Sequence, residues 1–220
     1  MTKARLDVPE DWISRTLDHA VQRYANRTGE LFYFSMKGHH EAVRHAYEDL
    51  GGEGQWWIPT LSNNLLKAIA LTLNGQWQND VVEWLCETQA FGSSGATDFS
   101  KFRKSASPEA VDKHVRRLRG CGLSTFPEYA TLRELHLVAN AVRHGPGRSL
   151  TELWEAHPEL WAPDSEIIRL RPWYMPAKEP LSQFIVSEAD MNRYNDAVCT
   201  FWNRVAEAAL TRPREGEGSD

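Results

Sequence analysis

The sequence has few of the features that identify common enzymes, membrane proteins and metal-binding folds. Its 220 residues include only three cysteines and no CxxC pair, so it indicates neither a zinc ribbon nor a dithiol redox centre. The hydrolase and nucleotide-binding motifs GxSxG, GxxxxGK[ST] and GxGxxG do not occur. There is no run of about 18 apolar residues and no apolar leader segment. We therefore expect a cytoplasmic protein without a membrane span.

An overall excess of basic residues is also missing. The 25 Lys and Arg against 30 Asp and Glu give a net charge of −5, which does not suit a nonspecific DNA-coating protein. Residues 101–119 are a local exception, and we predict that their basic side chains contact RNA phosphates: Lys101, Arg103, Lys104, Lys113, Arg116, Arg117 and Arg119. The alternative is that these side chains simply solvate a helix surface.

Apolar residues recur with helical spacing along most of the chain. The pattern predicts helices over 9–28, 30–50 with a break near Gly38, 57–73, 79–88, from 107 onward and over 187–210. The aromatic run LFYF after Glu30 is also compatible with the start of a strand. A chain of this length holds one core, so we expect a mainly α-helical single domain over 1–210 and a disordered tail over 211–220.

Proline interrupts the helical pattern before the last predicted helix. Five of the eleven prolines lie between residues 158 and 181, which excludes a regular helix there. Two short apolar segments, 167–170 and 183–186, have the composition of paired strands. We expect an irregular or β-hairpin insertion over 158–186.

A histidine-rich segment, HHEAVRH, contains groups that bind metals. His39, His40, Glu41 and His45 lie close together in the sequence, but only Glu41 and His45 have the i, i+4 spacing of a helical ligand pair. No third ligand follows at a recognisable spacing. The sequence alone therefore predicts no metal site and no cofactor.

The segment RELHLVANAVRH gathers unusual polar residues on one face of a predicted helix. At about 100° per residue, five side chains fall within an arc of roughly 100°: Arg133, His136, Asn140, Arg143 and His144. Solvated helix faces favour Lys and Glu, whereas His, Asn and Arg suit proton transfer and phosphate contact. An ordinary amphipathic polar face is the alternative.

The ends of this helix carry their own signals. Thr125 and Glu128 have the spacing of a capping box, and Gly145 with Pro146 indicates the helix end. Ser149 and Glu152 predict a second capping box that opens the next short helix.

The same helix resembles the late helix of HEPN proteins, many of which are ribonucleases of toxin–antitoxin and antiviral defence systems. Their pattern is similar to RNxxxH, which Asn140 and His144 match, while Ala139 stands where the Arg is expected. The resemblance implies a HEPN-like helical bundle and a homodimer whose paired helices form an RNA-binding cleft.

The resemblance further implies a metal-independent endoribonuclease of a prokaryotic defence or toxin–antitoxin system. His144 and His136 would act as acid and base, Asn140 would orient the phosphate, and Arg133 or Arg143 would stabilise its developing charge. The alternative is a noncatalytic module of the same fold that binds RNA, a nucleotide signal or a protein partner from the same system. The replacement by Ala139 favours that alternative.

Overall fold

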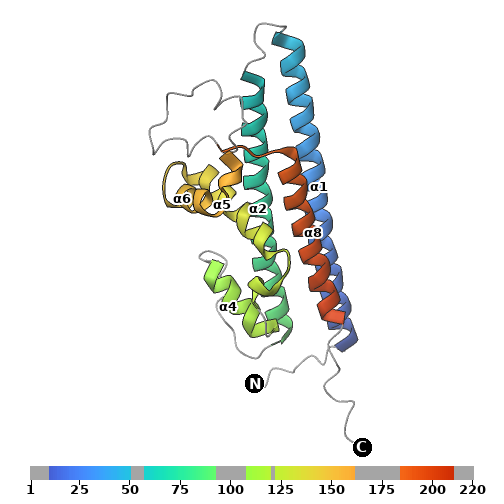
Figure 1. Cartoon of the computed structure of the whole chain (residues 1–220). Helices are drawn as coiled ribbons and strands as arrows, with labels where there is room; N and C mark the ends of the chain where they lie inside the picture. The colour runs from blue at the N-terminus through green and yellow to red at the C-terminus, as the bar shows by residue number, and fades with distance from the viewer. Residues whose placement is uncertain (1–9, 51–56, 93–107, 120–121, 162–183, 211–220) are drawn as a thin grey trace, which may run out of the picture.

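Three long helices form the body of the protein and lie side by side in Figure 1. The computed structural model describes residues 10–50, 57–92, 108–119, 122–161 and 184–210. Helices α1 (Glu10–Leu50) and α2 (Ile58–Gly92) run in opposite directions, and α8 (Glu188–Leu210) packs against both of them. The described residues contain no strand, which confirms the predicted mainly α-helical class.

Shorter helices cover the side of α2 that faces away from α1 (Figure 1). In chain order they are α4 (Pro108–Arg119), the 3-10 turn η2 (Leu123–Thr125), α5 (Tyr129–His144), α6 (Arg148–Ala156) and the 3-10 turn η3 (Pro158–Trp161). Helix α5 packs against both α2 and α8, so it connects this group of short helices to the long ones. Over the described residues, none of the helices has both the length and the hydropathy that a membrane crossing requires.

Aromatic side chains fill the contact between the long helices. Tyr24 of α1, Trp84 of α2, and Phe201 and Trp202 of α8 are buried completely or almost completely. The rings of Tyr24 and Trp202 lie 4.9 Å apart, and Trp84 meets Trp202 edge-on at 6.1 Å. Such buried aromatic pairs contribute about 0.5–1.5 kcal/mol each beyond the area they bury. Packing of this kind gives several of the tryptophans a structural role in the hydrophobic core.

The predicted break near Gly38 is wrong, because α1 continues through that residue to Leu50. A glycine in an exposed helix costs only about 1 kcal/mol relative to alanine, and the packing of α1 against α2 and α8 outweighs that cost. The aromatic run is helical too: Phe32 is half-buried while Tyr33 and Phe34 are exposed. The segment therefore starts no strand.

The predicted gap between residues 73 and 79 is wrong in the same way. Helix α2 passes without a break through Gly75. The neighbouring residues Asn74 and Trp77 are buried, so one face of this segment packs into the protein. Helix α2 ends at Gly92, and residues 93–107 lie outside the described residues.

Both predicted capping boxes are wrong. Thr125 ends η2 and donates its hydroxyl hydrogen to the carbonyl of Gly122, and α5 begins after Glu128 without a side-chain cap. Ser149 lies inside α6, which begins at Arg148. The predicted end of α5 is confirmed, because Gly145 has a φ of 65° and donates its N–H to Ala141.

The predicted insertion is described only at its two ends. Residues 162–183, with the first proposed strand, lie outside the described residues, and the segment from Phe184 to Ser187 forms no strand. It is held instead by Asn63 of α2, whose amide donates to the carbonyl of Phe184 and accepts the N–H of Val186. Ser187 and Asp190 then cap α8, so the predicted last helix is confirmed. The single domain and the tail over 211–220 stay predictions.

Candidate functional site

The polar face of α5 forms one wall of a pocket of about 370 Å³. The opposite face of the helix is anchored in the core through Leu135 and Val138, which are fully buried. Facing α5 across the pocket are Trp77 and Gln78 of α2. The side chains that line the pocket are Trp77, Gln78, Val81, Val82, Val111, Leu123, Tyr129, Leu132, Arg133, His136, Asn140 and Arg143.

Four of the five residues predicted on this face line the pocket, and one does not. Arg133, His136, Asn140 and Arg143 are lining residues, whereas His144 is exposed beyond the end of the pocket. The helix therefore separates its two polar-face histidines. His136 belongs to the cavity, while His144 belongs to the open surface at the end of α5.

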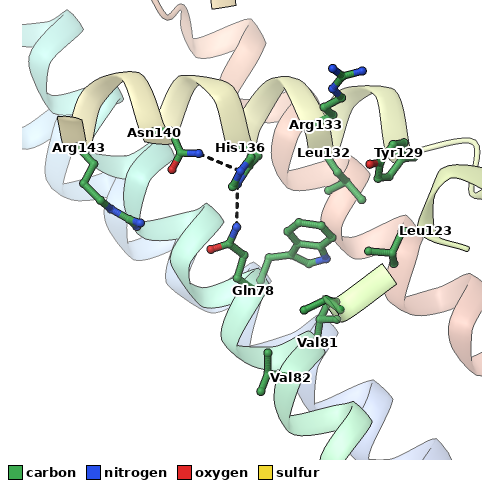
Figure 2. A pocket seen from close by; sticks show the side chains of 12 residues that line it. Gln78, Val81, Val82, Leu123, Tyr129, Leu132, Arg133, His136, Asn140 and Arg143 are labelled. Carbon is green, nitrogen blue, oxygen red and sulfur yellow. Dashed lines mark hydrogen bonds between the residues drawn. The ribbon is translucent and has the colours of Figure 1, made fainter. Parts of the chain in front are cut away.

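His136 is held between two amide groups (Figure 2). Its Nδ1 lies 2.8 Å from the amide of Gln78, and its Nε2 lies 2.9 Å from the amide of Asn140. A neutral imidazole has one N–H and one lone pair, so one amide must donate to the ring while the other accepts from it through its oxygen. A protonated ring would need both amides to accept. The clamp fixes the ring plane and occupies both nitrogens.

Much of the remaining lining of the pocket is apolar. Its apolar surface comes from Trp77, Val81, Leu123, Tyr129 and Leu132. Trp77 is 7% exposed, and its indole nitrogen is buried with no hydrogen-bond acceptor. A buried donor without a partner is unfavourable, so the Trp77 indole N–H is an unsatisfied group beneath the surface of the pocket wall.

The electrostatic balance of the pocket is positive. Its lining contains two arginines and no carboxylate. In Figure 2, Arg143 extends toward α2, whereas Arg133 extends in the opposite direction from the helix. Both side chains are exposed at the rim, so they can meet an anion that enters from solvent.

The structure describes only part of the predicted basic region. Lys101, Arg103 and Lys104 lie outside the described residues, as do the side chains of Arg117 and Arg119. Lys113 is exposed on α4. Arg116 donates to Asp112 at 2.7 Å, and it also approaches Ser124 of η2. Arg116 thus has a local structural partner, and its predicted contact with RNA stays a prediction.

Sequence reasoning missed two residues of this site and one of its supports. Trp77 and Gln78 lie between the helices predicted over 57–73 and 79–88, so the helical pattern assigns neither of them to a helix face. Glu134 is not among the residues of the predicted polar face, yet its carboxylate is buried and accepts two hydrogen bonds from Arg193 and one from Tyr194. No local signal marks Glu134, because its partners are about 60 residues away in the sequence.

Comparison with known proteins gives no relative for this chain. No protein-family model matches it, no curated protein is significantly similar in sequence, and no solved structure is significantly similar in fold.

Proposed function

We propose that the pocket between α2 and α5 binds a nucleotide, either free or as one unit of an RNA strand. The observation that carries the proposal is the combination, in one cavity, of an apolar wall, an imidazole clamped by two amides and two arginines without any carboxylate. This combination matches a ligand with an aromatic base, hydrogen-bonding edges and a phosphate.

The dimensions and chemistry of the pocket suit such a ligand. A volume of about 370 Å³ lies at the lower end of the range typical of small-molecule sites. A base would pack against Trp77 and Leu132, and its polar edge would meet Asn140. A phosphate would lie at Arg143, where a guanidinium offers paired donors to its oxygens.

The clamp on His136 favours binding over catalysis inside the pocket. A general acid or base must exchange a proton with the substrate, and it needs a ring nitrogen within reach of the reacting atom. Both ring nitrogens of His136 already have amide partners. A positioned imidazole of this kind is better suited to recognising a ligand than to transferring protons. A protein that only binds the nucleotide corresponds to the alternative drawn from the HEPN resemblance, a noncatalytic module of that fold.

The test is calorimetric titration of the protein with the four ribonucleoside monophosphates and, separately, with a short single-stranded RNA. Wild type should bind at one site, and Arg143→Ala should weaken binding about tenfold, because an ionic hydrogen bond contributes roughly 1.5–3 kcal/mol. Arg148→Ala, which removes an exposed arginine outside the pocket, is the matched control. Equal binding by wild type and Arg143→Ala would refute the pocket as the site. Binding of RNA but not of monophosphates would identify the strand as the ligand.

A metal-independent endoribonuclease is a second candidate, favoured by the position of His144. His144 is exposed one helical turn after Asn140 and next to Arg143, so it can approach a bound strand. It would accept the proton of a ribose 2′-hydroxyl while that oxygen attacks the phosphorus. The 5′-oxygen would leave with a proton donated by the second His144 of the homodimer, and the product would end in a 2′,3′-cyclic phosphate. Arg143 would stabilise the charge on the phosphorane.

This candidate requires a homodimer, in which two copies of α5 bring their His144 residues to one cleft. In this form the protein would act in a prokaryotic defence or toxin–antitoxin system together with a protein partner. The test is incubation of wild type and His144→Ala with labelled tRNA and total RNA in EDTA. Cleavage by wild type that is lost in the variant, with cyclic phosphate ends, supports the enzyme. Intact RNA with both proteins refutes it.

A further inference from the structure

A second polar cluster lies away from the pocket, where α1 meets the beginning of α8. His39 and His40 are consecutive residues of α1, and Glu188 is the first residue of α8. Metal-ligating atoms of these three residues all lie within 4.8 Å of one another. The histidine-rich segment of α1 thus gains a third ligand from a residue about 150 positions later in the chain.

We propose that His39, His40 and Glu188 bind a divalent transition metal, with Zn²⁺ as the best match. Two imidazole nitrogens and one carboxylate form a ligand set that Zn²⁺ prefers, and a water molecule can complete the tetrahedron. The assignment concerns the α1–α8 contact alone and is independent of the function proposed for the pocket.

The distances are close to those of an assembled site. The nearer Glu188 oxygen lies 3.2 Å from His40 Nε2 and 3.8 Å from His39 Nδ1. Zn²⁺ bonds of about 2.0–2.2 Å in a tetrahedron place neighbouring ligand atoms about 3.3–3.5 Å apart. Small rotations of the exposed His40 and Glu188 side chains are enough to reach that geometry.

The buried histidine carries the strongest argument. His39 is 3% exposed, and its Nδ1 is buried without a hydrogen-bond partner. Its other ring nitrogen, Nε2, lies 2.9 Å from the hydroxyl of Ser62 on α2, which fixes the direction of the ring. Metal-binding histidines are commonly oriented by a hydrogen bond to the nitrogen that does not bind the metal.

The Nδ1 nitrogen of His39 therefore faces the Glu188 carboxylate at a separation too long for a direct hydrogen bond. In the tautomer that donates its Nε2–H to Ser62, the Nδ1 lone pair of His39 faces the carboxylate and is repelled, and a cation between the two groups removes that repulsion. A metal ion shared with His40 would satisfy both the orphan nitrogen and the carboxylate.

The basic side chains near the three ligands are paired with acidic ones, so they oppose the binding of a cation only weakly. Lys37 and Arg44 line the adjoining surface hollow, but each has an acidic partner one turn further along α1, Glu41 and Glu48 respectively. Among the described residues, the carboxylate of Glu188 has no lysine or arginine partner, and its neighbours at ion-pair distance are the two histidines. The capping box of Ser187 and Asp190 holds the backbone of Glu188 in place at the start of α8.

The experiment is titration of the untagged, EDTA-treated and dialysed full chain with Zn²⁺ by calorimetry, and with Co²⁺ followed by visible absorption. Wild type should bind one ion, and the Co²⁺ complex should show the intense bands of a four-coordinate site. Glu188→Gln changes an exposed residue without altering its size, and it should weaken Zn²⁺ binding at least tenfold. His39→Ala should weaken binding to a similar extent.

His45→Ala is the matched control, because His45 is an exposed histidine on the same helix and lies beside Glu48 instead of Glu188. That variant should bind Zn²⁺ as tightly as wild type. Zn²⁺ should also raise the Tm of wild type but not of Glu188→Gln, since the ion ties α8 to α1. Unchanged affinity in Glu188→Gln, or no binding by wild type, would overturn the proposal.

Discussion

The guanidinium of Arg193 on α8 holds the carboxylate of Glu134 on α5 through two hydrogen bonds of 2.6 Å. The hydroxyl of Tyr194 donates a third, at 2.7 Å, to the same carboxylate. Burial alone would raise the pKa of Glu134, but the hydrogen bonds and the charge of Arg193 outweigh burial and leave that pKa lowered. Glu134 is therefore a buried anion that ties α5, and with it the pocket, to α8.

Removing the arginine of this pair should destabilise the protein. We expect Arg193→Ala to lower the free energy of unfolding by roughly 2–4 kcal/mol, because the buried carboxylate loses its counter-charge. The partial exposure of Arg193 moderates the loss. Urea unfolding followed by circular dichroism measures it. Arg148→Ala, which breaks an exposed ion pair with Glu152, should leave stability unchanged. Equal stability of the Arg193 variant and wild type would contradict the anchor.

The buried Asp80 gives a second stability prediction, this time through pH. Burial raises the pKa of Asp80 to about 6, although hydrogen bonds from Gln76 and Arg27 oppose the shift. The folded protein thus holds this proton more tightly than the unfolded chain, in which an Asp has a pKa of about 3.9. The contribution of Asp80 to stability is fully present below pH 4 and is lost as the pH rises through about 6.

The comparison of wild type with Asp80→Asn isolates this effect from those of other carboxylates. Between pH 4 and 7, the free energy of unfolding of wild type should fall relative to that of the variant by roughly 1–3 kcal/mol. Chemical unfolding at several pH values measures both. Glu83→Gln changes the more exposed acidic partner of Arg27 and keeps Asp80, so its free energy of unfolding should follow that of wild type over this pH range. A difference between wild type and Asp80→Asn that stays constant with pH would rule out the raised pKa.

The glycine that ends α5 gives a third prediction. Gly145 has a φ of 65° and a ψ of −150°, a conformation that is essentially restricted to glycine and costs other residues about 1–3 kcal/mol. Gly145→Ala should therefore lower the free energy of unfolding by about 1–3 kcal/mol, although no atom lies near the added methyl group. Gly147→Ala, two residues on in extended backbone, should have little effect in the same urea titration. A larger loss in the Gly147 variant would contradict this explanation.

Local patterns in the sequence predict the helices well, and the two helix breaks that they wrongly predict have a common cause. The end of α5 at Gly145 follows from a local conformational need, so it could be predicted. The expected breaks near Gly38 and after Leu73 do not occur, because packing against neighbouring helices outweighs the weak local preference of a glycine. Because of the expected break after Leu73, the sequence pattern does not place Trp77 and Gln78, which complete the lining of the pocket.

The candidate sites depend on contacts between distant parts of the chain. The polar face of α5 could be found from helical spacing alone, since its members lie within twelve residues. The partner of His136 on α2 and the partner of His39 on α8 cannot be found in that way. Helical periodicity indicates that a face is buried or polar, but it does not indicate which helix covers that face.

The two arginines of the pocket should differ in their effect on nucleotide binding. Arg143 extends toward α2 and Arg133 extends away from it (Figure 2). We expect Arg143→Ala to weaken binding about tenfold and Arg133→Ala less than about threefold, because an exposed charge beyond direct contact acts through screened attraction. Calorimetric titration of both variants with the nucleotide that wild type binds gives the comparison. Raising the salt concentration should reduce the Arg133 effect most. A greater loss in the Arg133 variant would mean that the phosphate lies at the other end of α5.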